Sequence, residues 1–268
     1  MITMLEALTA NAAVISVLML ALCACAVRIN DVSFIDAVWG AGMALLALAS
    51  FLQVTAPGTR AAMITAMTMI WGTRLGLHLF MRWWRSGEDP RYARILAKAR
   101  RTGRYGRGAL LRVFAPQAVL LYITCLPAQL GVLASGAGAD LGTLAIAGSV
   151  VWLIGMIFET VGDWQLARFR ADPASRGRVL DTGLWRYTRH PNYFGDACVW
   201  WGIWLAAADT SWLIALASLP GPLFLTLTLT RWSGKPLLEK GLAQSRPGYA
   251  DYVARTSGFF PLPPRNKG

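Results

Sequence analysis

The densest group of side chains that could do chemistry lies between Gly183 and Leu205, in the sequence GLWRYTRHPNYFGDACVWWGIWL. The stretch begins with a polar run and continues, without a linker, into an almost wholly apolar segment rich in tryptophan. Polar and ionisable groups at membrane depth are costly, and they usually face a ligand or a partner group. We therefore predict a binding site here. Its candidate residues are Tyr187, Arg189, His190, Asn192, Tyr193 and Asp196.

A basic stripe is the second feature. Arg74, His78, Arg82 and Arg85 are spaced i, i+4, i+8 and i+11, which places them on one face of a helix. Arginine binds phosphate oxygens in a bidentate way, so the stripe suits a phosphate or pyrophosphate that enters from the cytosol. Two alternatives stay open: Arg82 and Arg85 can extend to the membrane surface, and His78 is equally well explained as a hydrogen-bonded core residue.

Acidic residues within the apolar segments form the third set. An unpaired buried carboxylate costs several kcal/mol, so each acid is expected to have a partner. Glu159 and Asp163 are spaced i, i+4 and share a helix face that continues toward Arg170. A ligand with hydroxyl or amide groups would satisfy them, and so would an internal network with arginines.

Asp36, in the sequence NDVSFIDAVWG beside Trp39, is the only acid of its apolar segment. Desolvation would raise the pKa of its carboxyl group, which suits a proton donor or the orienter of one. The structural alternative is an ion pair with an arginine of the next apolar segment.

The composition indicates what positions these side chains. Of the 268 residues, 55% are hydrophobic and 15% are charged, and the mean hydropathy is +0.44. These values predict an all-α polytopic membrane protein, a seven-transmembrane helix bundle that forms a single integral membrane domain over residues 1–268. The predicted spans are 5–27, 33–54, 61–84, 110–134, 141–164, 193–208 and 211–232.

Basic residues gather in the segments 85–109 and 165–192 and in the tail 233–268, whereas the connections at 136–140 and around Asp209 have none. The positive-inside rule makes the basic segments cytoplasmic loops, with the amino terminus outside and the carboxyl terminus inside. Arg60 is left in an outer loop. The arginines of the first loop can also simply fix topology or meet anionic headgroups. This applies most to the run that looks exposed, which comprises Arg100, Arg101, Arg104 and Arg107.

Several function classes are excluded. The two histidines are more than a hundred residues apart and the four cysteines form no CxxC pair, so we expect no metal site. The sequence has no P-loop, GxSxG or GxGxxG motif. A net charge of +12 that is confined to loops reflects topology and not a nucleic-acid partner. We expect a monomer.

The block TGLWRYTRHPNYFGD resembles the carboxy-terminal signature of the membrane-embedded steroid 5α-reductase family and its bacterial relatives. It is also similar to the matching stretch of the sterol C14-reductase and lamin B receptor group. The resemblance runs from Asn30 to Pro261 and includes NDVSFIDAVWG, WGTRLGLH…GEDPRY and RPGYADYVARTSGFFP. It implies a bacterial inner-membrane protein, with a periplasmic amino terminus and an active site open to the cytoplasm. Such a protein would bind NADPH and reduce the C=C bond of an enone in a lipophilic substrate, typically a 3-oxo-Δ4 steroid.

The resemblance also implies roles for individual residues. Asn192, Tyr193 and Asp196 would lie along the cofactor, with Glu159 and Asp163 near its nicotinamide or ribose half. Asp36 would be the catalytic carboxylate that holds the ketone. Vertebrate enzymes have a glutamine where this chain has Ile35, and Trp71 is taken to replace their catalytic tyrosine. Arg170, Arg189 and His190 would meet the phosphates, and the further predicted cofactor-binding residues are Trp39, Arg74, His78, Arg82, Arg85, Arg91, Tyr92, Tyr187 and Tyr252.

Two other functions stay open. Membrane methyltransferases of the isoprenylcysteine or phospholipid type use S-adenosylmethionine and share a similar RHPxYxG string. Their tails carry adjacent glutamates, whereas this tail has only Glu239, and they lack the acid that Asp196 provides. The third possibility is a lipid- or sterol-binding scaffold, which would bind no NADPH.

Overall fold

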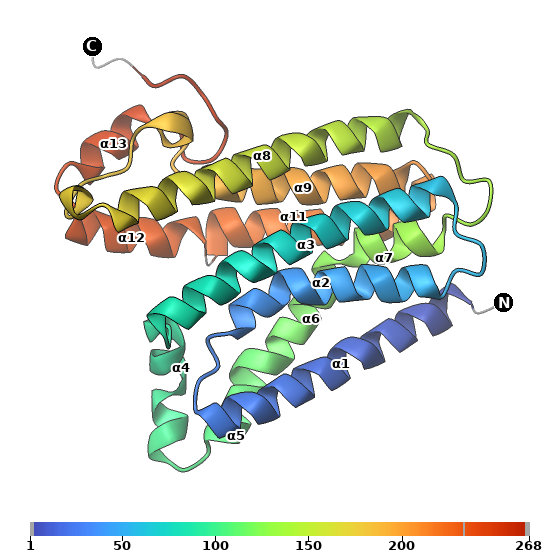
Figure 1. The fold of residues 1–268 in the computed structure, drawn as a ribbon, viewed down its shortest axis with the longest axis horizontal. Helices are drawn as coiled ribbons and strands as arrows, with labels where there is room; N and C mark the ends of the chain where they lie inside the picture. Colours follow the sequence, from blue (N-terminus) through green and yellow to red (C-terminus); the bar gives the residue numbers. More distant parts are fainter. Residues whose placement is uncertain (1–2, 233, 266–268) are drawn as a thin grey trace. The chain divides into compact units, whose positions relative to one another are not determined.

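The computed structural model describes residues 3–232 and 234–265, and over these residues the protein is helical, without strands (Figure 1). Of the predicted tail, residue 233 and residues 266–268 lie outside the described part. The chain forms two compact units. Unit 1 runs to Ala145 and resumes over Ile203–Gly221, and unit 2 comprises Ile146–Gly202 and the residues from Pro222 on.

Unit 1 consists mainly of three long helices followed by a series of shorter ones. Its elements are α1 (Met4–Ile29), α2 (Ile35–Leu52), α3 (Thr59–Ser86), α4 (Pro90–Arg101), α5 (Tyr105–Ala109), the π-helical turn η1 (Leu110–Phe114), α6 (Ala115–Thr124), α7 (Leu126–Leu133) and α10 (Trp212–Ser218). The predicted loop 85–109 therefore contains two helices.

Unit 2 is built on the greater part of two long helices. Its elements are α8 (Thr143–Ala171) from residue 146, the 3₁₀ turns η2 (Pro173–Ser175) and η3 (Gly183–Arg186), α9 (Pro191–Ala208) up to residue 202, α11 (Pro220–Leu227), the π-helical turn η4 (Thr228–Trp232), α12 (Lys235–Ser245) and α13 (Tyr249–Arg255). The helix α8 continues seven residues beyond the predicted end of the fifth span at 164.

Among the residues that the structure describes, four helical stretches are long and apolar enough to cross a membrane: Met4–Ile29, Ile35–Leu52, Thr143–Ala171 and Trp212–Trp232. A fifth is Tyr105–Thr124 with Leu126–Leu133, which is bent by 48°. Pro127 explains the bend, because proline lacks an N–H and its ring crowds the carbonyl four residues earlier. The predicted spans 61–84 and 193–208 fall on α3 and α9. The basic stripe of α3 and the polar residues in the first turns of α9 lower the mean hydropathy of these two helices. The count of seven spans and the side of each terminus stay predictions.

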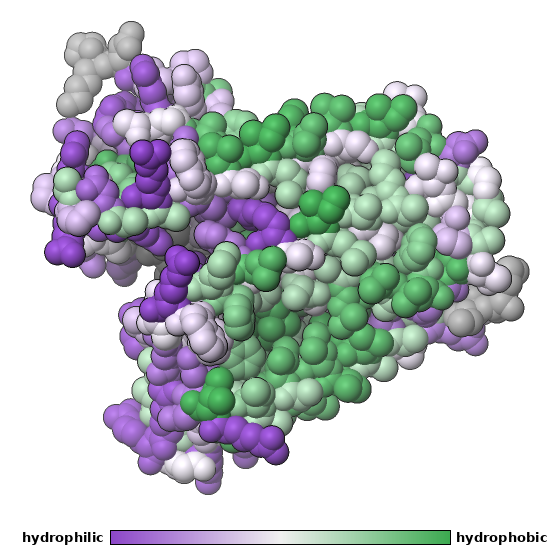
Figure 2. All heavy atoms as spheres, in the orientation of Figure 1, coloured by the Kyte–Doolittle hydropathy of each residue, from purple (hydrophilic) through white to green (hydrophobic). Residues whose placement is uncertain are grey.

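Apolar side chains also cover much of the surface. Large hydrophobic residues are exposed along the long helices, among them Val17, Leu20, Ile70, Leu77 and Ile146. Figure 2 shows apolar atoms over the long helices and hydrophilic atoms over α4, α5, α12 and α13. Such a surface is expected where lipid is the solvent, and the protein is therefore a membrane protein.

Glycines allow α2 and α3 to approach closely in unit 1. A Cβ atom added at Gly40 would overlap the carbonyl oxygen of Gly72, and one added at Gly76 would lie 3.2 Å from the carbonyl oxygen of Ala37. Small residues at helix contacts are typical of membrane proteins, because packing replaces the hydrophobic driving force there. The contact fixes the register of α2 against α3.

A similar contact joins α8 and α9 within unit 2. A Cβ atom added at Gly195 would lie 2.6 Å from the carbonyl oxygen of Gly155 and 2.5 Å from the backbone nitrogen of Glu159. At the next level along α8, a Cβ atom at Gly162 would lie 3.1 Å from the ring of Pro191. The glycines thereby bring the acidic face of α8 against the start of α9.

A buried polar cluster links α1, α2 and α7 in unit 1. The amide of Asn11 donates to the hydroxyl of Ser50 at 2.8 Å and to the side-chain oxygen of Gln129 at 3.0 Å. The amide of Gln53 donates to the Asn11 oxygen at 2.9 Å. Asn11, Ser50 and Gln129 are fully buried, so these bonds replace those that water would provide.

An ion pair holds the opposite end of unit 1 from α4. Arg60 contacts the Asp209 carboxylate at 3.0 Å, and the same carboxylate accepts from the backbone N–H of Gly142 at 2.8 Å. Pro57 and Gly136, in two of the same connections, form an isolated antiparallel β-bridge. The three connections assigned to the outer side therefore lie together.

We expect Gly40→Ala to destabilise the protein by about 1–3 kcal/mol, because the new methyl group overlaps the α3 backbone. The measurement is thermal unfolding of the detergent-purified protein. Gly241→Ala is the matched control, since Gly241 lies in α12 with nothing within 4 Å of the added Cβ atom. It should be neutral or stabilising, and equal losses in both variants would contradict the close packing.

Candidate functional site

Asp36 is the centre of a hydrogen-bonded cluster in unit 1. It lies in the first turn of α2, where the helix dipole favours a negative charge. One carboxylate oxygen accepts from the hydroxyl of Tyr92 at 2.6 Å. The other accepts from Arg91 at 2.8 Å and from Arg82 at 3.3 Å. Arg82 belongs to α3, so the predicted alternative, an ion pair of Asp36 with an arginine of the next apolar segment, is present. The hydrogen bond from the Tyr92 phenol was not predicted.

The start of α4 places Arg91 and Tyr92 beside this carboxylate. Asp89 caps the helix by accepting from the backbone N–H of Arg91 at 2.8 Å, and Pro90 occupies the first turn, as is favoured there. Asp89 also accepts from the Arg91 guanidinium at 2.8 Å. Burial alone would raise the pKa of Asp89, but the bonds from Arg91 outweigh it, and the pKa lies below its usual value. The backbone N–H of Asp89 in turn donates to Ser33 just before α2.

Tyr92 is held as a neutral phenol. Its side chain is 7% exposed, and burial, followed by the charge and hydrogen bond of Asp36, raises the pKa of the hydroxyl far above its usual value. Gln117 of α6 donates to the same hydroxyl at 3.4 Å and accepts from the indole N–H of Trp39. The cluster therefore runs as a chain of donors and acceptors from Trp39 to Arg91.

The structure places Tyr92, and not Trp71, beside Asp36. The close approaches put residue 37 opposite residue 76 and residue 40 opposite residue 72, so Asp36 is level with residue 77. Trp71 lies about six residues earlier in α3, on the order of 9 Å at 1.5 Å per residue, and is buried at 2% exposure. The sequence assigned Tyr92 only to the cofactor, because α4 was expected to be a loop.

The basic stripe of α3 keeps its predicted face. Arg74 and His78 are half-buried, and Arg82 and Arg85 near the end of the helix are exposed. Arg100, which the sequence grouped with an exposed run, is instead a half-buried side chain that pairs with Glu88 at 2.5 Å and donates to the carbonyl of Asn30 at 2.8 Å.

In unit 2, the acidic face of α8 meets the start of α9. Glu159 and Asp163 are buried at 2% and 9% exposure. The amide of Asn192 donates to Asp163 at 3.1 Å, and its oxygen accepts from the backbone N–H of Tyr193 at 3.1 Å. The structure thus brings together an acid and an amide that the sequence assigned to the same ligand. Arg170 and Asp196 lie on these two helices, in the same unit.

Arg189 and His190 form a separate cluster with the tail. Glu239 of α12 accepts from Arg189 at 2.8 Å and from the His190 ring at 3.0 Å. Burial would raise the pKa of Glu239, but the bonds from His190 and Arg189 lower it to about 2. Burial lowers the pKa of His190 more than Glu239 raises it, so the ring is neutral at pH 7. It stacks on the ring of Tyr193 at 5.2 Å.

The tail is attached to the segment before α9 by further bonds. The hydroxyl of Tyr252 donates to the carbonyl of Trp185 at 2.5 Å, and the backbone N–H of Leu262 donates to the carbonyl of Tyr187 at 3.0 Å. Arg189 also donates to the carbonyl of Val253 at 3.2 Å. The Tyr252 hydroxyl and part of the Arg189 guanidinium are therefore engaged within unit 2, and the predicted contacts of these two residues with a cofactor stay predictions.

A pocket of about 240 Å³ opens where the tail folds back. Its lining includes the arginines Arg189, Arg255 and Arg265 together with Thr256 and Ser257. Arg255 pairs with Asp181 at 2.5 Å. Positive charge and hydroxyl donors suit a phosphate group. The sequence treated Arg255 and Arg265 only as topology signals, because nothing local showed that residues 189 and 265 line one pocket.

Two residues of these clusters, Gln117 and Glu239, were missed or given another role. Gln117 was detectable as a polar residue in an apolar run, which is a functional signal in membranes. Glu239 was used only to argue against methyltransferases. Among the residues that the structure describes, no group of three or more metal-binding side chains occurs, and the predicted absence of a metal site stays a prediction.

We expect Glu239→Gln to destabilise the protein by about 2 kcal/mol at pH 7, because Arg189 and His190 lose a charged acceptor. A carboxyl group whose pKa falls from 4.5 to about 2 on folding contributes stability above pH 4.5 and loses it as the pH falls toward 2. The difference between the wild type and the variant should therefore shrink over that range in thermal unfolding experiments. Lys240→Gln, at an exposed neighbour, should change little at any pH.

A family model described as "Protein of unknown function (DUF1295)" matches residues 22–256. The chain is 33% identical over 103 residues to an uncharacterized protein of Schizosaccharomyces pombe. The match covers 35% of this chain and 27% of the yeast protein, so it spans about a quarter of that relative's length. No solved structure matches the chain.

Proposed function

The chain belongs to the DUF1295 family, and from that premise we propose that it is an NADPH-dependent reductase. Its reaction would reduce the C=C bond of an enone in a lipophilic substrate, typically a 3-oxo-Δ4 steroid, as the resemblance to the steroid 5α-reductase family implies. The observation that carries the proposal is the 2.6 Å hydrogen bond from the buried Tyr92 to Asp36, whose other oxygen is held by Arg82 and Arg91.

The Asp36–Tyr92 pair has the chemistry to polarise a carbonyl group. A phenol with a raised pKa keeps its proton at neutral pH. Tyr92 has one O–H to donate, so a substrate carbonyl oxygen would take this hydrogen bond in place of the Asp36 carboxylate. Arg82 and Arg91 orient the Asp36 carboxylate by contacting its other oxygen. Preorganised donors of this kind stabilise the negative charge that develops on the oxygen in the transition state.

When bound, NADPH supplies a hydride to the β-carbon of the enone. The enolate that results carries its charge on the oxygen, where Tyr92 would donate. A proton added at the α-carbon then completes the saturated ketone, so one hydride and one proton are consumed for each C=C bond reduced. Apolar walls would exclude water from the reacting atoms.

The residues of unit 2 fit parts of a dinucleotide. The pocket lined by Arg189, Arg255 and Arg265 suits a phosphate group. Asn192 and the carboxylate of Asp163 offer a donor and an acceptor of the kind that amide and ribose hydroxyl groups require.

We further propose seven spans, a monomer, and a bacterial inner-membrane location with the basic segments in the cytoplasm. Within unit 1, the loop before α2 contacts the segment 86–100, and Arg60 lies with residues 140 and 209. This grouping supports the proposed sides. Alternating spans assign the loop before α2 and the segment 86–100 to the cytoplasm, and they assign Arg60 and residues 140 and 209 to the periplasm.

The proposed cofactor is tested by thermal unfolding of the purified protein with NADPH, NADH or S-adenosylmethionine. A ligand at about 100 times its dissociation constant should stabilise the protein by roughly 2.7 kcal/mol. We expect stabilisation by NADPH alone. Stabilisation by S-adenosylmethionine alone would instead favour a methyltransferase, and no change with any of the three would favour a lipid-binding scaffold.

Tyr92→Phe should lower turnover of an enone steroid by about 10² or more, the scale of losing one oxyanion donor. Asp36→Asn should also lower turnover, because the charged acceptor that positions the Tyr92 hydroxyl is removed. The NADPH dissociation constant should change little, because these groups act on the substrate. Tyr122→Phe is the matched control: its hydroxyl donates to the carbonyl of Leu8 elsewhere in unit 1, and turnover should be kept. Equal losses of turnover and of NADPH affinity would remove the catalytic role of the pair.

A further inference from the structure

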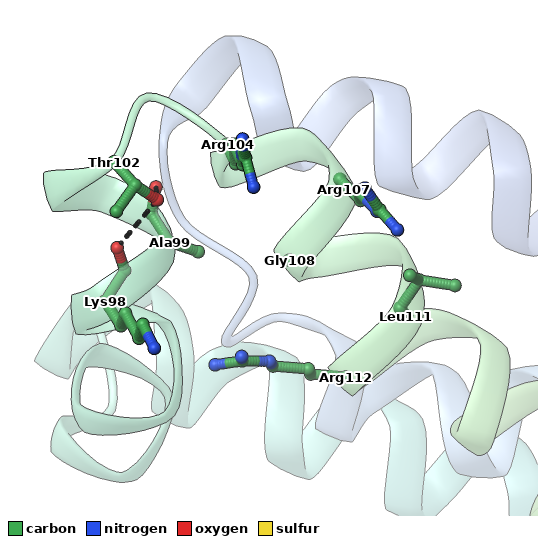
Figure 3. A pocket seen from close by; sticks show the side chains of 8 residues that line it. All are labelled: Lys98, Ala99, Thr102, Arg104, Arg107, Gly108, Leu111 and Arg112. Atoms are coloured by element: carbon green, nitrogen blue, oxygen red, sulfur yellow. Dashed lines mark hydrogen bonds between the residues drawn. The ribbon is translucent and has the colours of Figure 1, made fainter.

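A second basic pocket lies in unit 1, at the end of α4 away from Tyr92 (Figure 3). Its volume is about 380 Å³, and it is formed where α4, α5 and η1 meet. Lys98 belongs to α4, Arg104 is the residue just before α5, Arg107 belongs to α5, and Arg112 belongs to η1. Figure 3 shows the ends of Lys98 and Arg112 pointing toward one another across the pocket.

The floor of this pocket is tightly built. A Cβ atom added at Gly108 would lie 2.5 Å from the Cβ atom of Ala99, so the backbones of α4 and α5 approach closely and leave the four cationic side chains around the rim. Arg112 is oriented by a hydrogen bond to the carbonyl of Ile95 at 3.2 Å. The π-helical turn η1 forms one wall, and such turns are frequent at functional sites.

The charge of the pocket is unbalanced. Four of its eight lining residues are basic and none is acidic. The acid of the neighbouring segment, Glu88, is engaged with Arg100 at 2.5 Å. Like charges at this density repel one another, so a bound anion with several oxygen atoms would stabilise the arrangement.

One side of the pocket is apolar. Leu111 is part of its lining and is 54% exposed. Eight residues further along the same helical segment, Val119 is 57% exposed. The surface therefore passes from cationic side chains to an apolar strip along a helix that is one half of a candidate membrane span. Basic pockets at such a boundary suit lipid headgroups.

We propose that this pocket binds the phosphate group of an anionic membrane lipid, with the acyl chains along Leu111 and Val119. The recognition is that of a phosphate by Lys98, Arg104, Arg107 and Arg112. A free phosphate ion would meet the same cations but would gain nothing from the apolar strip. The proposal does not rest on the proposed reaction.

The test is native mass spectrometry of the detergent-purified full chain titrated with phosphatidylglycerol. The double variant Arg104→Gln/Arg107→Gln should bind this lipid about thirtyfold more weakly, since the loss of each cation near the lipid weakens binding about fivefold. Leu111→Gln, which removes the apolar edge and no charge, should also weaken the binding of phosphatidylglycerol.

The matched control is Arg94→Gln/Arg101→Gln, which removes two exposed charges of α4 that do not line the pocket. It should change the affinity by less than about threefold, because charges outside the pocket act only through the screened surface potential. Equal losses in the two double variants would show that general surface charge attracts the lipid, and the proposed pocket would be overturned.

Inorganic phosphate separates the two sources of the anion. Added in millimolar excess, it should displace little phosphatidylglycerol. Displacement of the lipid by phosphate, or equal binding of the Leu111→Gln variant and the wild type, would assign the pocket to a free phosphate and overturn the lipid proposal. Because the readout is lipid binding, failure here leaves the proposed reductase activity untouched.

Discussion

A polar side chain among apolar helices must find its hydrogen-bond partners inside the protein, because lipid provides none. Each described cluster follows this constraint. Asn11 takes its partners from α2 and α7, and Asp36 takes its partners from α3 and α4. The helices are thus joined at a few polar points that have little freedom to exchange partners.

Small local features decide where these points form. The cap at Asp89 and the proline after it start α4 two residues before Tyr92. Tyr92 therefore lies in the first turn of the helix, where its direction is fixed. Glycines bring α2 against α3 and α8 against α9, so that carboxylates on one helix reach donors on its neighbour. Neither feature does chemistry, yet each determines a donor–acceptor distance in a cluster that could.

The sequence predicted well what depends on local pattern. Apolar length and basic loops indicated a helical membrane protein, and i, i+4 spacing correctly put Glu159 and Asp163 on one face that meets Asn192. It failed where partners are distant in the chain. Nothing near Asp36 shows that Tyr92, 56 residues later, would donate to it, so Trp71 was taken in its place. Likewise, Arg100 looked exposed because its partner Glu88 lies 12 residues earlier, before the start of α4, and this segment was expected to be a loop.

The bonds between the tail and the segment before α9 have a consequence for biosynthesis. Tyr252 reaches back 67 residues to Trp185, and Thr188 bonds to a carbonyl 71 residues later. A ribosome releases the chain from the amino terminus, so residues 185–190 must wait for most of the remaining chain before their partners exist. The ion pair of Arg60 with Asp209 imposes a still longer delay. Unit 2 therefore reaches its final form only after residues up to 262 have been synthesised. Until residue 239 has emerged, His190 and Arg189 are without the acceptor that Glu239 later provides.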